Sequence, residues 1–513
     1  MVSTQSATGP RIESRNPATG EVIGSVPIMG EAEVRERVQR ARKAQEGWAA
    51  LDHRERTRQL LRVQDWLAAN ARMVAERLSA ETGKPRFDSL LHEVTATCEL
   101  IKTLASEAPK VLSPTRVSSG LLVTKKAWKV YEPHGVIGVI SPWNFPLTLS
   151  MSATLTALFA GNAVVLKPSE VTPLVGDIVT EAFAAAEVHP DVVQVVSGDG
   201  STGAALVRAG VDKIAFTGST RTGKLIMAAA AETLTPVVME LGGKDPMVVC
   251  ADADIEMAAS GAVWAGFANS GQICMSVERV YVPESVHDRF VDAVVERTEA
   301  LRQGRDTDES NVDVGAMIAP TQAAIVEAHV ADAVAKGATV RTGGARRTDL
   351  GGDFFAPTVL TGCTHDMDIL NEETFGPVLP IVKVRDEDEA VRLANDSRYG
   401  LTASVWTSNR AKGERIAREL KAGSVLINDH ITVYAVTELP FGGIKESGFG
   451  RVHGVEGLLE FARPKSVVLE RLPALNRLFW FPYPKAAFDI SARATGFMYR
   501  TNPVDRVKSL LGL

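Results

Sequence analysis

Short apolar segments alternate with segments of helical length between residues 135 and 233, and this alternation constrains the fold more than any other feature. Strands are expected at 135–140, 163–167, 192–196 and 213–217, with helices at 147–160, 174–187, 202–209 and 222–233. Strands that are apolar along their whole length are buried on both faces, and helical crossovers join such strands in parallel. The sequence therefore predicts an α/β protein whose parallel sheet is covered by helices on both sides.

The rest of the chain extends this pattern. Two stretches, 31–50 and 53–82, have helical periodicity with charged faces. Residues 121–124 and 128–131 are expected to form strands of a ribbon, and a second alternating set follows from about 245 to 447. At 513 residues the chain exceeds the size at which one hydrophobic core keeps growing, so we expect two or three domains.

Composition argues against several classes of protein. The net charge of −6 argues against nucleic acid as a partner. The four cysteines are widely spaced and form no CxxC pair, which indicates a reducing compartment without a disulfide or zinc framework. Residues 1–10 lack the apolar stretch of a signal peptide, and no run approaches the ~18 apolar residues of a membrane span. We therefore expect a cytoplasmic protein without a metal site.

The segment 470–513 has a different character. It carries seven Lys and Arg against three Asp and Glu, although the whole chain is acidic. Aromatic residues gather in it at Phe479, Trp480, Phe481 and Tyr483, and an amphipathic pattern follows over 488–499. A basic segment with aromatic residues suits the interface of a membrane, but it also suits packing against its own or a neighbouring subunit. Both interpretations stay open.

Three residues with complementary chemistry lie in separate stretches. Cys274 follows the loop Asn269–Ile273, and a thiol reacts as its thiolate. Glu240 lies 34 residues earlier among apolar side chains, where burial would raise its pKa and suit it to act as a base. Asn144 lies between two prolines and offers an oxyanion donor, worth roughly 2.7–4 kcal/mol at other sites. Each also has a structural explanation: an inert buried thiol, an ion-pair partner and a helix cap.

Glycine-rich and charged turns indicate where a dinucleotide would bind. Residues 198–203 read GxGxxG after an apolar strand, but the following strand ends without the acidic residue that usually completes this pattern. Lys167 and Glu170 at the end of another strand can bond ribose hydroxyls, and 216–223 offers backbone N–H groups at a helix start. Ordinary strand-to-helix turns remain an alternative for each of these stretches.

Taken together and in this order, the motifs resemble those of the aldehyde dehydrogenase superfamily, over about residues 11–469. They are Pro142-Trp143-Asn144-Phe145-Pro146, Lys167-Pro168-Ser169-Glu170, Phe216-Thr217-Gly218-Ser219, Glu240-Leu241-Gly242-Gly243-Lys244, Gly271-Gln272-Ile273-Cys274, Glu372-Glu373-Thr374-Phe375-Gly376-Pro377 and Pro440-Phe441-Gly442-Gly443. The resemblance implies a Rossmann-type cofactor domain (1–114 and 134–242), an α/β catalytic domain (243–447) and a small β oligomerisation element (115–133 and 448–469), followed by the extension 470–513. It also implies a homodimer or homotetramer.

The same resemblance implies the chemistry. Cys274 would attack an aldehyde, NAD or NADP would accept the hydride, and Glu240 would activate the water that hydrolyses the thioester, while Asn144 would hold the oxyanion. The residues expected at the cofactor are Ile140, Trp143, Lys167, Glu170, Gly200, Phe216, Gly218, Ser219, Leu241, Glu373 and Phe375. Glu170 favours NAD, because a carboxylate repels the 2′-phosphate of NADP. Glu240 argues against relatives that transfer the acyl group to CoA.

The side chains near the nucleophile in sequence suggest the substrate. Those expected to line its pocket are apolar: Phe145, Leu149, Ile273, Met275 and Phe441. The motifs contain no cation to hold a substrate carboxylate, and Ser276 stands where succinic-semialdehyde relatives commonly carry a second Cys. We therefore expect a medium- or long-chain aliphatic, or an aromatic, aldehyde. A semialdehyde or aminoaldehyde substrate is one alternative, and a non-catalytic binding or scaffold protein on the same fold is a remote one.

Overall fold

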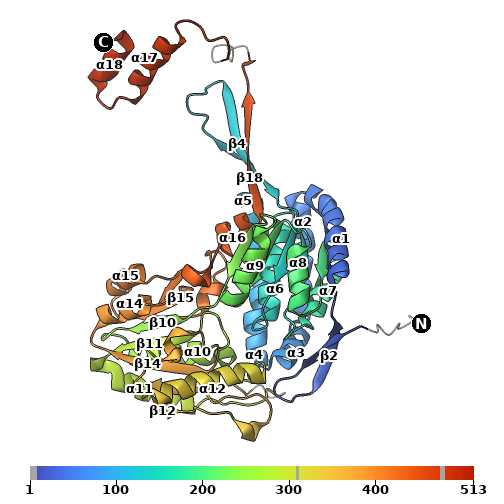
Figure 1. Ribbon diagram of the computed structural model, residues 1–513, viewed down its shortest axis with the longest axis vertical. Coiled ribbons are helices and arrows are strands. Elements are labelled where there is room, and N and C mark those ends of the chain that lie inside the picture. Colours follow the sequence, from blue (N-terminus) through green and yellow to red (C-terminus); the bar gives the residue numbers. More distant parts are fainter. Residues whose placement is uncertain (1–8, 308–310, 474–479) are drawn as a thin grey trace, which may run out of the picture. The chain divides into compact units, whose positions relative to one another are not determined.

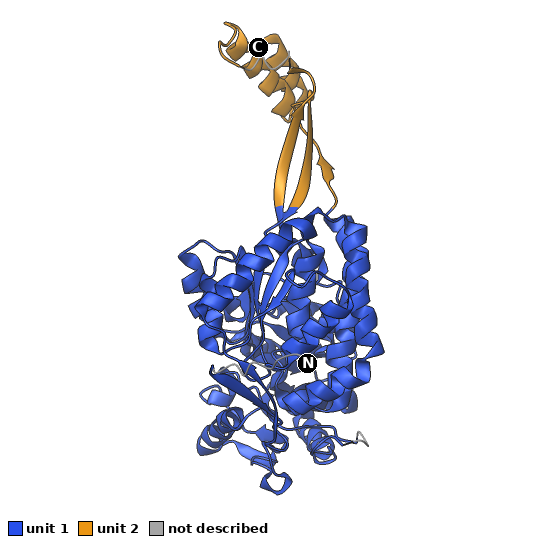
Figure 2. Cartoon of the chain, turned by 90° about the vertical axis from the view of Figure 1, so that its right-hand side faces the viewer, with its two compact units in different colours: residues 1–112, 132–463 blue, residues 113–131, 464–513 orange. Residues whose placement is uncertain are grey.

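The computed structural model describes residues 9–307, 311–473 and 480–513 (Figure 1). Its contacts group residues 1–112 and 132–463 into one compact unit and residues 113–131 and 464–513 into a second (Figure 2). The first unit contains two large sheets, and the second contains a three-stranded sheet and two helices.

The first sheet of unit 1 confirms the predicted α/β alternation. Its order is β17-β9-β8-β5-β6-β7, and the five strands β5 to β9 are parallel. They are β5 (Val136–Ile140), β6 (Ala163–Lys167), β7 (Val193–Val195), β8 (Lys213–Thr217) and β9 (Val237–Glu240). Every residue of β5 and β6 is buried, as expected of central strands covered on both faces.

Helices cover both faces of this sheet. One apolar cluster joins the sheet to α1 (Glu31–Ala50), α8 (Gly200–Arg208) and α9 (Thr220–Ala231). The other helices are α2 (His53–Ala69), α3 (Ala71–Thr82), α4 (Arg86–Ser89), a π-helix (Leu90–Thr95), α5 (Ala96–Val111), α6 (Pro146–Phe159) and α7 (Val175–Ala185). The stretch predicted as one helix over 53–82 is therefore two helices. Asn70 separates them, and its amide and backbone N–H groups both bond to the carbonyl of Trp66.

The second sheet has the order β12-β13-β14-β11-β10-β15-β16. Its strands are β10 (Asp245–Val249), β11 (Val277–Pro283), β12 (Thr339–Thr342), β13 (Thr358–Thr361), β14 (Val378–Val384), β15 (Thr402–Trp406) and β16 (Ser424–Ile427). One face packs on α10 (Ile255–Phe267) and α11 (Glu284–Glu299), and the other on α12 (Pro320–Ala335), α14 (Glu387–Asn395) and α15 (Arg410–Glu419). Only β12 runs antiparallel to its neighbour among these described strands.

Unit 2 corrects one expected strand. Its sheet has the order β18-β4-β3, with β3 at Thr115–Val117, β4 at Lys125–Pro133 and β18 at Ala462–Glu470. Residues 121–124, expected as a strand, instead form turns that lead into β4, because Gly120 adopts a positive φ of 58° and reverses the chain. Phe479, one of the aromatic residues singled out above, lies outside the described residues.

The segment 448–463 lies in unit 1, although the sequence groups it with the oligomerisation element. The reason is strand pairing, because β17 (Gly448–Phe449) runs antiparallel to β9 with Gly448 opposite Glu240. A side chain at Gly448 would collide with the carbonyl of Met239, so this close approach requires glycine. Helix α16 (Gly454–Glu460) follows in the same unit. Among the described helices, none combines the length and the apolar character needed to cross a bilayer.

Candidate active site

A cavity of about 280 Å³ opens at the carboxyl ends of β5, β8 and β9. Its lining residues are Pro142, Trp143, Asn144, Leu149, Thr217, Gly218, Ser219, Glu240, Leu241, Gly242, Cys274, Gln322, Ile325, Glu373 and Phe375. The successive strands β5 and β6 are neighbours, whereas β8 lies on the other side of β5. Open α/β sheets bind ligands at such a switch of strand order. The cavity therefore unites residues from five of the seven sequence motifs.

The loop before Cys274 is strained and held by many contacts. Asn269, Ser270 and Gly271 have φ angles of 48°, 57° and 70°, all in the left-handed region. A non-glycine residue pays about 1–3 kcal/mol for such a conformation, so the surroundings must impose it. Asn269 Nδ2 donates to the carbonyl of Gln272 at 3.2 Å, and Ser270 Oγ donates to Gly315 at 2.9 Å. The loop thus presents Cys274 in one fixed position.

Cys274 is half-buried, and its environment favours the neutral thiol. Burial raises the pKa of the Cys274 thiol, and the nearby carboxylates of Asp245, Glu373 and Glu240 raise it further. A thiolate is the reactive form, so this cysteine needs a proton acceptor close by.

Glu240 lies at the end of β9 and is 6% exposed. Neither carboxylate oxygen has a hydrogen-bond partner. Burial raises the pKa of Glu240 well above its ordinary value, and the charge of Arg451 offsets this only in part. Gly442 leaves room for the side chain, because a Cβ there would lie 2.8 Å from Glu240 Oε1. A buried, unpaired carboxylate is a costly arrangement, and it is typical of a group that accepts a proton during a reaction.

Asn144 does not cap the helix that follows it. Instead its Nδ2 donates to the carbonyl of Gln272 at 3.1 Å, next to the nucleophile loop. Its own carbonyl accepts bonds from Lys84 Nζ at 2.5 Å and from Asn269 Nδ2 at 3.2 Å. The structure therefore brings Asn144, Cys274 and Glu240 to one cavity.

The other end of the cavity has features that fit a dinucleotide. Gly218 and Ser219 lie at the amino end of α9, where free N–H groups favour phosphate, and Ser219 Oγ caps the helix through Thr222 N at 3.3 Å. The rings of Trp143 and Phe375 meet edge to face, with centroids 5.3 Å apart.

Glu373 accepts a bond from Gly243 N at 3.0 Å. Burial and the carboxylate of Glu278 raise the pKa of Glu373 to about 8.

Five of the expected cofactor residues lie outside this cavity lining: Ile140, Lys167, Glu170, Gly200 and Phe216. Lys167 and Glu170 pair with each other at 2.9 Å. In the GxGxxG turn, Asp199 caps α8 by accepting from Ser201 N at 2.8 Å, and its negative charge would repel a phosphate there. Phe216 lines a second, smaller cavity.

That smaller cavity, of about 30 Å³, adjoins Cys274 and Glu240. Of the residues expected to contact substrate, Leu149 and Phe441 line it, while Ile273 and Met275 are packed into the core of the second sheet. Phe145 lies beneath Lys84 Nζ, which is 4.1 Å from its ring centre.

Sequence reasoning missed several polar residues at the site. Ser152 and Tyr434 line the smaller cavity, and Ser152 Oγ lies 3.2 Å from His453 Nε2. Two buried lysines also support the site: Lys84 pairs with Glu93 at 2.7 Å, and Lys244 pairs with Glu278 at 2.5 Å. Lys244 belongs to the motif Glu240–Lys244, so the sequence offered a signal for its place at the site. Lys84 offered none beyond a charge next to a glycine.

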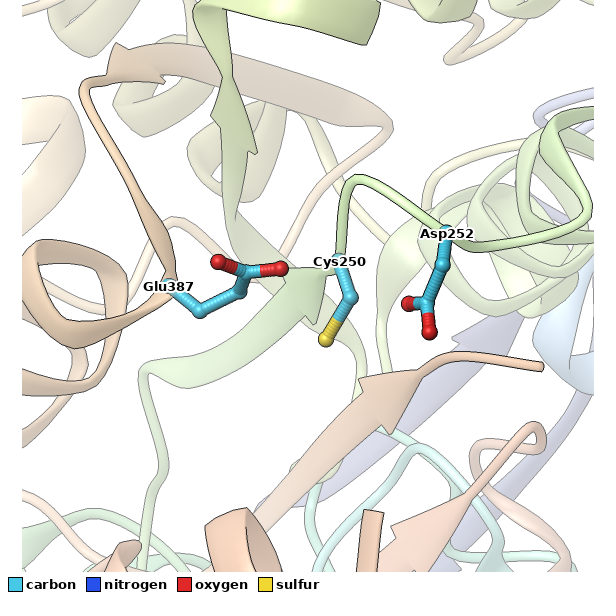
Figure 3. Close-up of side chains that lie close together, drawn as sticks. All are labelled: Cys250, Asp252 and Glu387. Atoms are coloured by element: carbon cyan, nitrogen blue, oxygen red, sulfur yellow. The ribbon is translucent and has the colours of Figure 1, made fainter. Parts of the chain in front are cut away.

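A separate cluster contains Cys250, Asp252 and Glu387, whose potential ligand atoms lie within 4.8 Å of one another (Figure 3). Figure 3 shows Cys250 between the two carboxylates. Lys412 Nζ lies 3.3 Å from Asp252 and 3.2 Å from Glu387. This ammonium group pairs with both carboxylates and offsets part of their negative charge.

Comparison with known proteins agrees with this geometry. Residues 3–467 match the model of the aldehyde dehydrogenase family. The chain is 39% identical over 490 residues to 4,4′-diapolycopene aldehyde oxidase of Methylomonas sp., covering 95% of this chain and 91% of that protein. It is 39% identical to a putative succinate-semialdehyde dehydrogenase [NADP(+)] of Mycolicibacterium smegmatis, covering 89% of this chain and 88% of that one.

A solved structure extends the likeness to three dimensions. The NAD+ complex of an aldehyde dehydrogenase from Bacillus cereus has a TM-score of 0.86 and 36% identity, and the match covers 90% of this chain and 93% of that one. The sequence match covers nearly the whole chain, the fold is shared, and one cavity unites the motifs. This chain therefore belongs to the aldehyde dehydrogenase family and is an NAD- or NADP-dependent aldehyde dehydrogenase.

Proposed function

We propose that this enzyme oxidises uncharged, apolar aldehydes to carboxylic acids by acyl transfer through Cys274 and hydrolysis. The observation that carries the hydrolytic part is the buried carboxylate of Glu240, which lacks a hydrogen-bond partner and lines both cavities next to Cys274. Such a group can take the proton of an attacking water. Trp143, Gly218, Ser219, Glu373 and Phe375 would hold the nicotinamide cofactor, which accepts the hydride when bound.

Each step then has a residue to perform it. The Cys274 thiol gives its proton to a water molecule that enters the cavity, and the thiolate sulfur then adds to the aldehyde carbon and forms a hemithioacetal oxyanion. An N–H of the Asn144 amide donates to that oxygen and stabilises the developing charge. After loss of the hydride the acyl group remains as a thioester on Cys274. Glu240 removes a proton from water as it attacks the thioester, and the acid and the free thiol are released.

The cavities favour an uncharged substrate. Neither Lys nor Arg occurs among the residues that line the two cavities at Cys274. A buried carboxylate without a cation is strongly disfavoured, so a semialdehyde acid would bind poorly. The relative named for 4,4′-diapolycopene, which is 39% identical over 95% of this chain, favours a long apolar substrate.

Aromatic side chains lie between the turn of Asn144 and a surface cavity. His92 lies 6.2 Å from the ring of Phe145 and 6.4 Å from the ring of Trp264. Trp264 is 40% exposed, and together with Phe87 it lines a surface cavity of about 410 Å³. These ring contacts connect Phe145, which is next in sequence to Asn144, with the lining of the surface cavity.

The second candidate is a semialdehyde, because the Mycolicibacterium smegmatis relative carries the name of a succinate-semialdehyde dehydrogenase. A panel of n-alkanals of increasing length, benzaldehyde, an aminoaldehyde and succinic semialdehyde separates the two, each assayed for kcat/KM with NAD and with NADP. We expect kcat/KM to rise about fourfold per buried methylene, since each contributes ~0.8 kcal/mol. Cys274→Ala serves as the inactive control. A maximum at succinic semialdehyde would contradict the proposal.

We further propose that unit 2 contains two interaction elements. The sheet β18-β4-β3 ends in β3, whose three residues are exposed, and an unpaired edge strand is suited to pairing with a second copy of the chain. Light scattering of the purified protein tests this self-association, and a monomer at micromolar concentration would contradict it.

The second element is the helical pair α17 (Ala487–Tyr499) and α18 (Pro503–Leu511). None of their side chains is buried. On α18, the residues Val504, Val507, Leu510 and Leu511 are 53–63% exposed, and their spacing places them on one face. The opposite face packs on α17, where a side chain at Gly496 would collide with Ser509. The apolar face therefore points outward rather than into a core.

The charge of this segment indicates what kind of partner would contact the apolar face of α18. Residues 485–513 are basic, with Lys485, Arg493, Arg500, Arg506 and Lys508 against Asp489 and Asp505, whereas the whole chain carries −6. Apolar side chains flanked by basic ones suit an anionic lipid surface, with about 1 kcal/mol per basic residue near it. We propose that α17 and α18 lie on an anionic membrane, a place where apolar aldehydes also collect.

Sedimentation with vesicles tests this contact. Phosphatidylcholine vesicles that contain phosphatidylglycerol should bind the protein, pure phosphatidylcholine vesicles should bind it less, and Val507→Glu/Leu511→Glu should abolish binding. Val507→Leu/Leu511→Val, which changes the same two positions but keeps the face apolar, is the matched control. If the variant instead changes the oligomeric mass and leaves vesicle binding intact, a second copy of the chain covers this face and the membrane proposal is wrong.

A further inference from the structure

Two buried lysine–glutamate pairs support the active site, and neither reaches the cavity itself. The side chains of Lys84 and Glu93 are both 0% exposed, and those of Lys244 and Glu278 are 0% and 4% exposed. A buried ion pair contributes little to stability compared with apolar residues of the same size, because desolvation offsets the attraction. The role of each pair must therefore lie in the backbone segments to which it is hydrogen-bonded.

The first pair holds the turn that carries Asn144. Lys84 Nζ donates to Glu93 Oε1 at 2.7 Å and to the carbonyl of Asn144 at 2.5 Å. Glu93 Oε2 accepts from the backbone N–H groups of Leu147 and Thr148, at 2.7 and 3.2 Å. Lys84 thus bonds the turn before α6, and Glu93 bonds the first turn of α6.

The second pair holds a different part of the site. Glu278 accepts the backbone N–H groups of Thr374 and Phe375, both at 2.8 Å, and Lys244 Nζ donates to Thr374 Oγ1 at 3.0 Å. Phe375 has a positive φ of 51°, a conformation that these bonds impose on it. This loop carries Glu373 and Phe375 on the proposed cofactor side of the cavity.

We propose that Lys84 is a positioning residue for the reaction, which places the Asn144 amide where the oxyanion forms. The Asn144 carbonyl also accepts from Asn269 Nδ2, and the Asn144 amide donates to Gln272, so this residue is tied to the nucleophile loop as well. Lys84 Nζ is a second donor to the same backbone carbonyl of Asn144, and it comes from outside that loop. A shift of about 1 Å in such a group costs on the order of 100-fold in rate.

The variant Lys84→Met alone leaves Glu93 buried and unpaired, so it can fail to fold. Lys84→Met/Glu93→Gln avoids this, because the neutral glutamine still accepts from the amino end of α6. We expect this double variant to keep a Tm close to that of the wild type, to lose about 10- to 100-fold in kcat and to retain its KM for NAD. Lys244→Met/Glu278→Gln is the matched control, and there we expect the KM for NAD to rise more than kcat falls.

The inference rests on the proposed role of Asn144, and a double-mutant cycle separates the two. Asn144→Ala should lower kcat about 100- to 1000-fold, and Lys84→Met/Glu93→Gln should add little to that loss. If Asn144→Ala keeps full kcat, the oxyanion role itself fails. If Asn144→Ala loses activity while the Lys84 variant keeps it, or if the two losses multiply, only the positioning role is overturned.

Discussion

Replacing Glu240 with glutamine should slow hydrolysis of the thioester but leave its formation, with transfer of the hydride, intact. The change removes a base that lines the cavity beside Cys274 but keeps the size of the side chain. Neither carboxylate oxygen has a hydrogen-bond partner, so the substitution breaks no bond in the resting enzyme. A general base contributes about 10²- to 10⁴-fold, which corresponds to about 2.7–5.4 kcal/mol of the barrier to thioester hydrolysis.

Transient kinetics measures this directly. On rapid mixing of the Glu240→Gln variant with aldehyde and NAD, we expect a burst of one NADH per active site followed by very slow turnover. Acid quenching after the burst should leave an acyl adduct on the Cys274 peptide, detected by mass spectrometry. Wild-type steady-state turnover in the variant, or an acylated peptide that never accumulates, would refute the reasoning.

The raised pKa of Glu240 predicts that, with rising pH, the kcat of the wild type increases while its stability relative to Glu240→Gln decreases. Burial raises the pKa of Glu240 above its ordinary value of 4.5, so the folded wild type binds more protons than the unfolded chain between these two pKa values. Its stability therefore falls relative to that of Glu240→Gln as the pH rises through this window, while kcat of the wild type rises as the base loses its proton. Tm values of both proteins across pH, with kcat of the wild type, provide the comparison.

Other predictions concern the thiol, the cofactor and the substrate. Alkylation of Cys274 by iodoacetamide in the cofactor-free enzyme should be slow at neutral pH and keep rising above pH 9, because burial and nearby carboxylates raise the pKa of this thiol; a plateau below pH 8 would contradict this. Glu170→Ala should raise the NADP-to-NAD ratio of kcat/KM about tenfold by removing a charge that repels a 2′-phosphate, and an unchanged ratio would place the ribose elsewhere. Leu149→Ala should lower kcat/KM for long alkanals about 5- to 100-fold but spare acetaldehyde, since one pocket contact is worth ~1–3 kcal/mol. An equal loss with both substrates would place Leu149 outside the substrate pocket.

Local patterns sufficed for much of the fold. The strand predicted at 163–167 is observed with the same bounds, and the helix predicted at 147–160 begins one residue earlier at Pro146. The pattern failed at 121–124, where four residues of strand-like composition form turns. Strand propensity describes a half-buried pleated surface. The turn at Gly120 keeps 121–124 out of the described strands of unit 2, so this stretch does not form part of such a surface.

Residue types and their order show which chemical groups the chain contains and how its strands and helices alternate. Motif order was enough to nominate Cys274, Glu240 and Asn144, because each depends on residue type and local context. The folded structure was needed to show that these three residues line one cavity and that the Glu240 carboxylate has no hydrogen-bond partner there. It was also needed to show that Lys84, 60 residues earlier in the chain, donates a hydrogen bond to the backbone carbonyl of Asn144. Burial and hydrogen bonding depend on segments that are distant in the chain, so no local pattern encodes them.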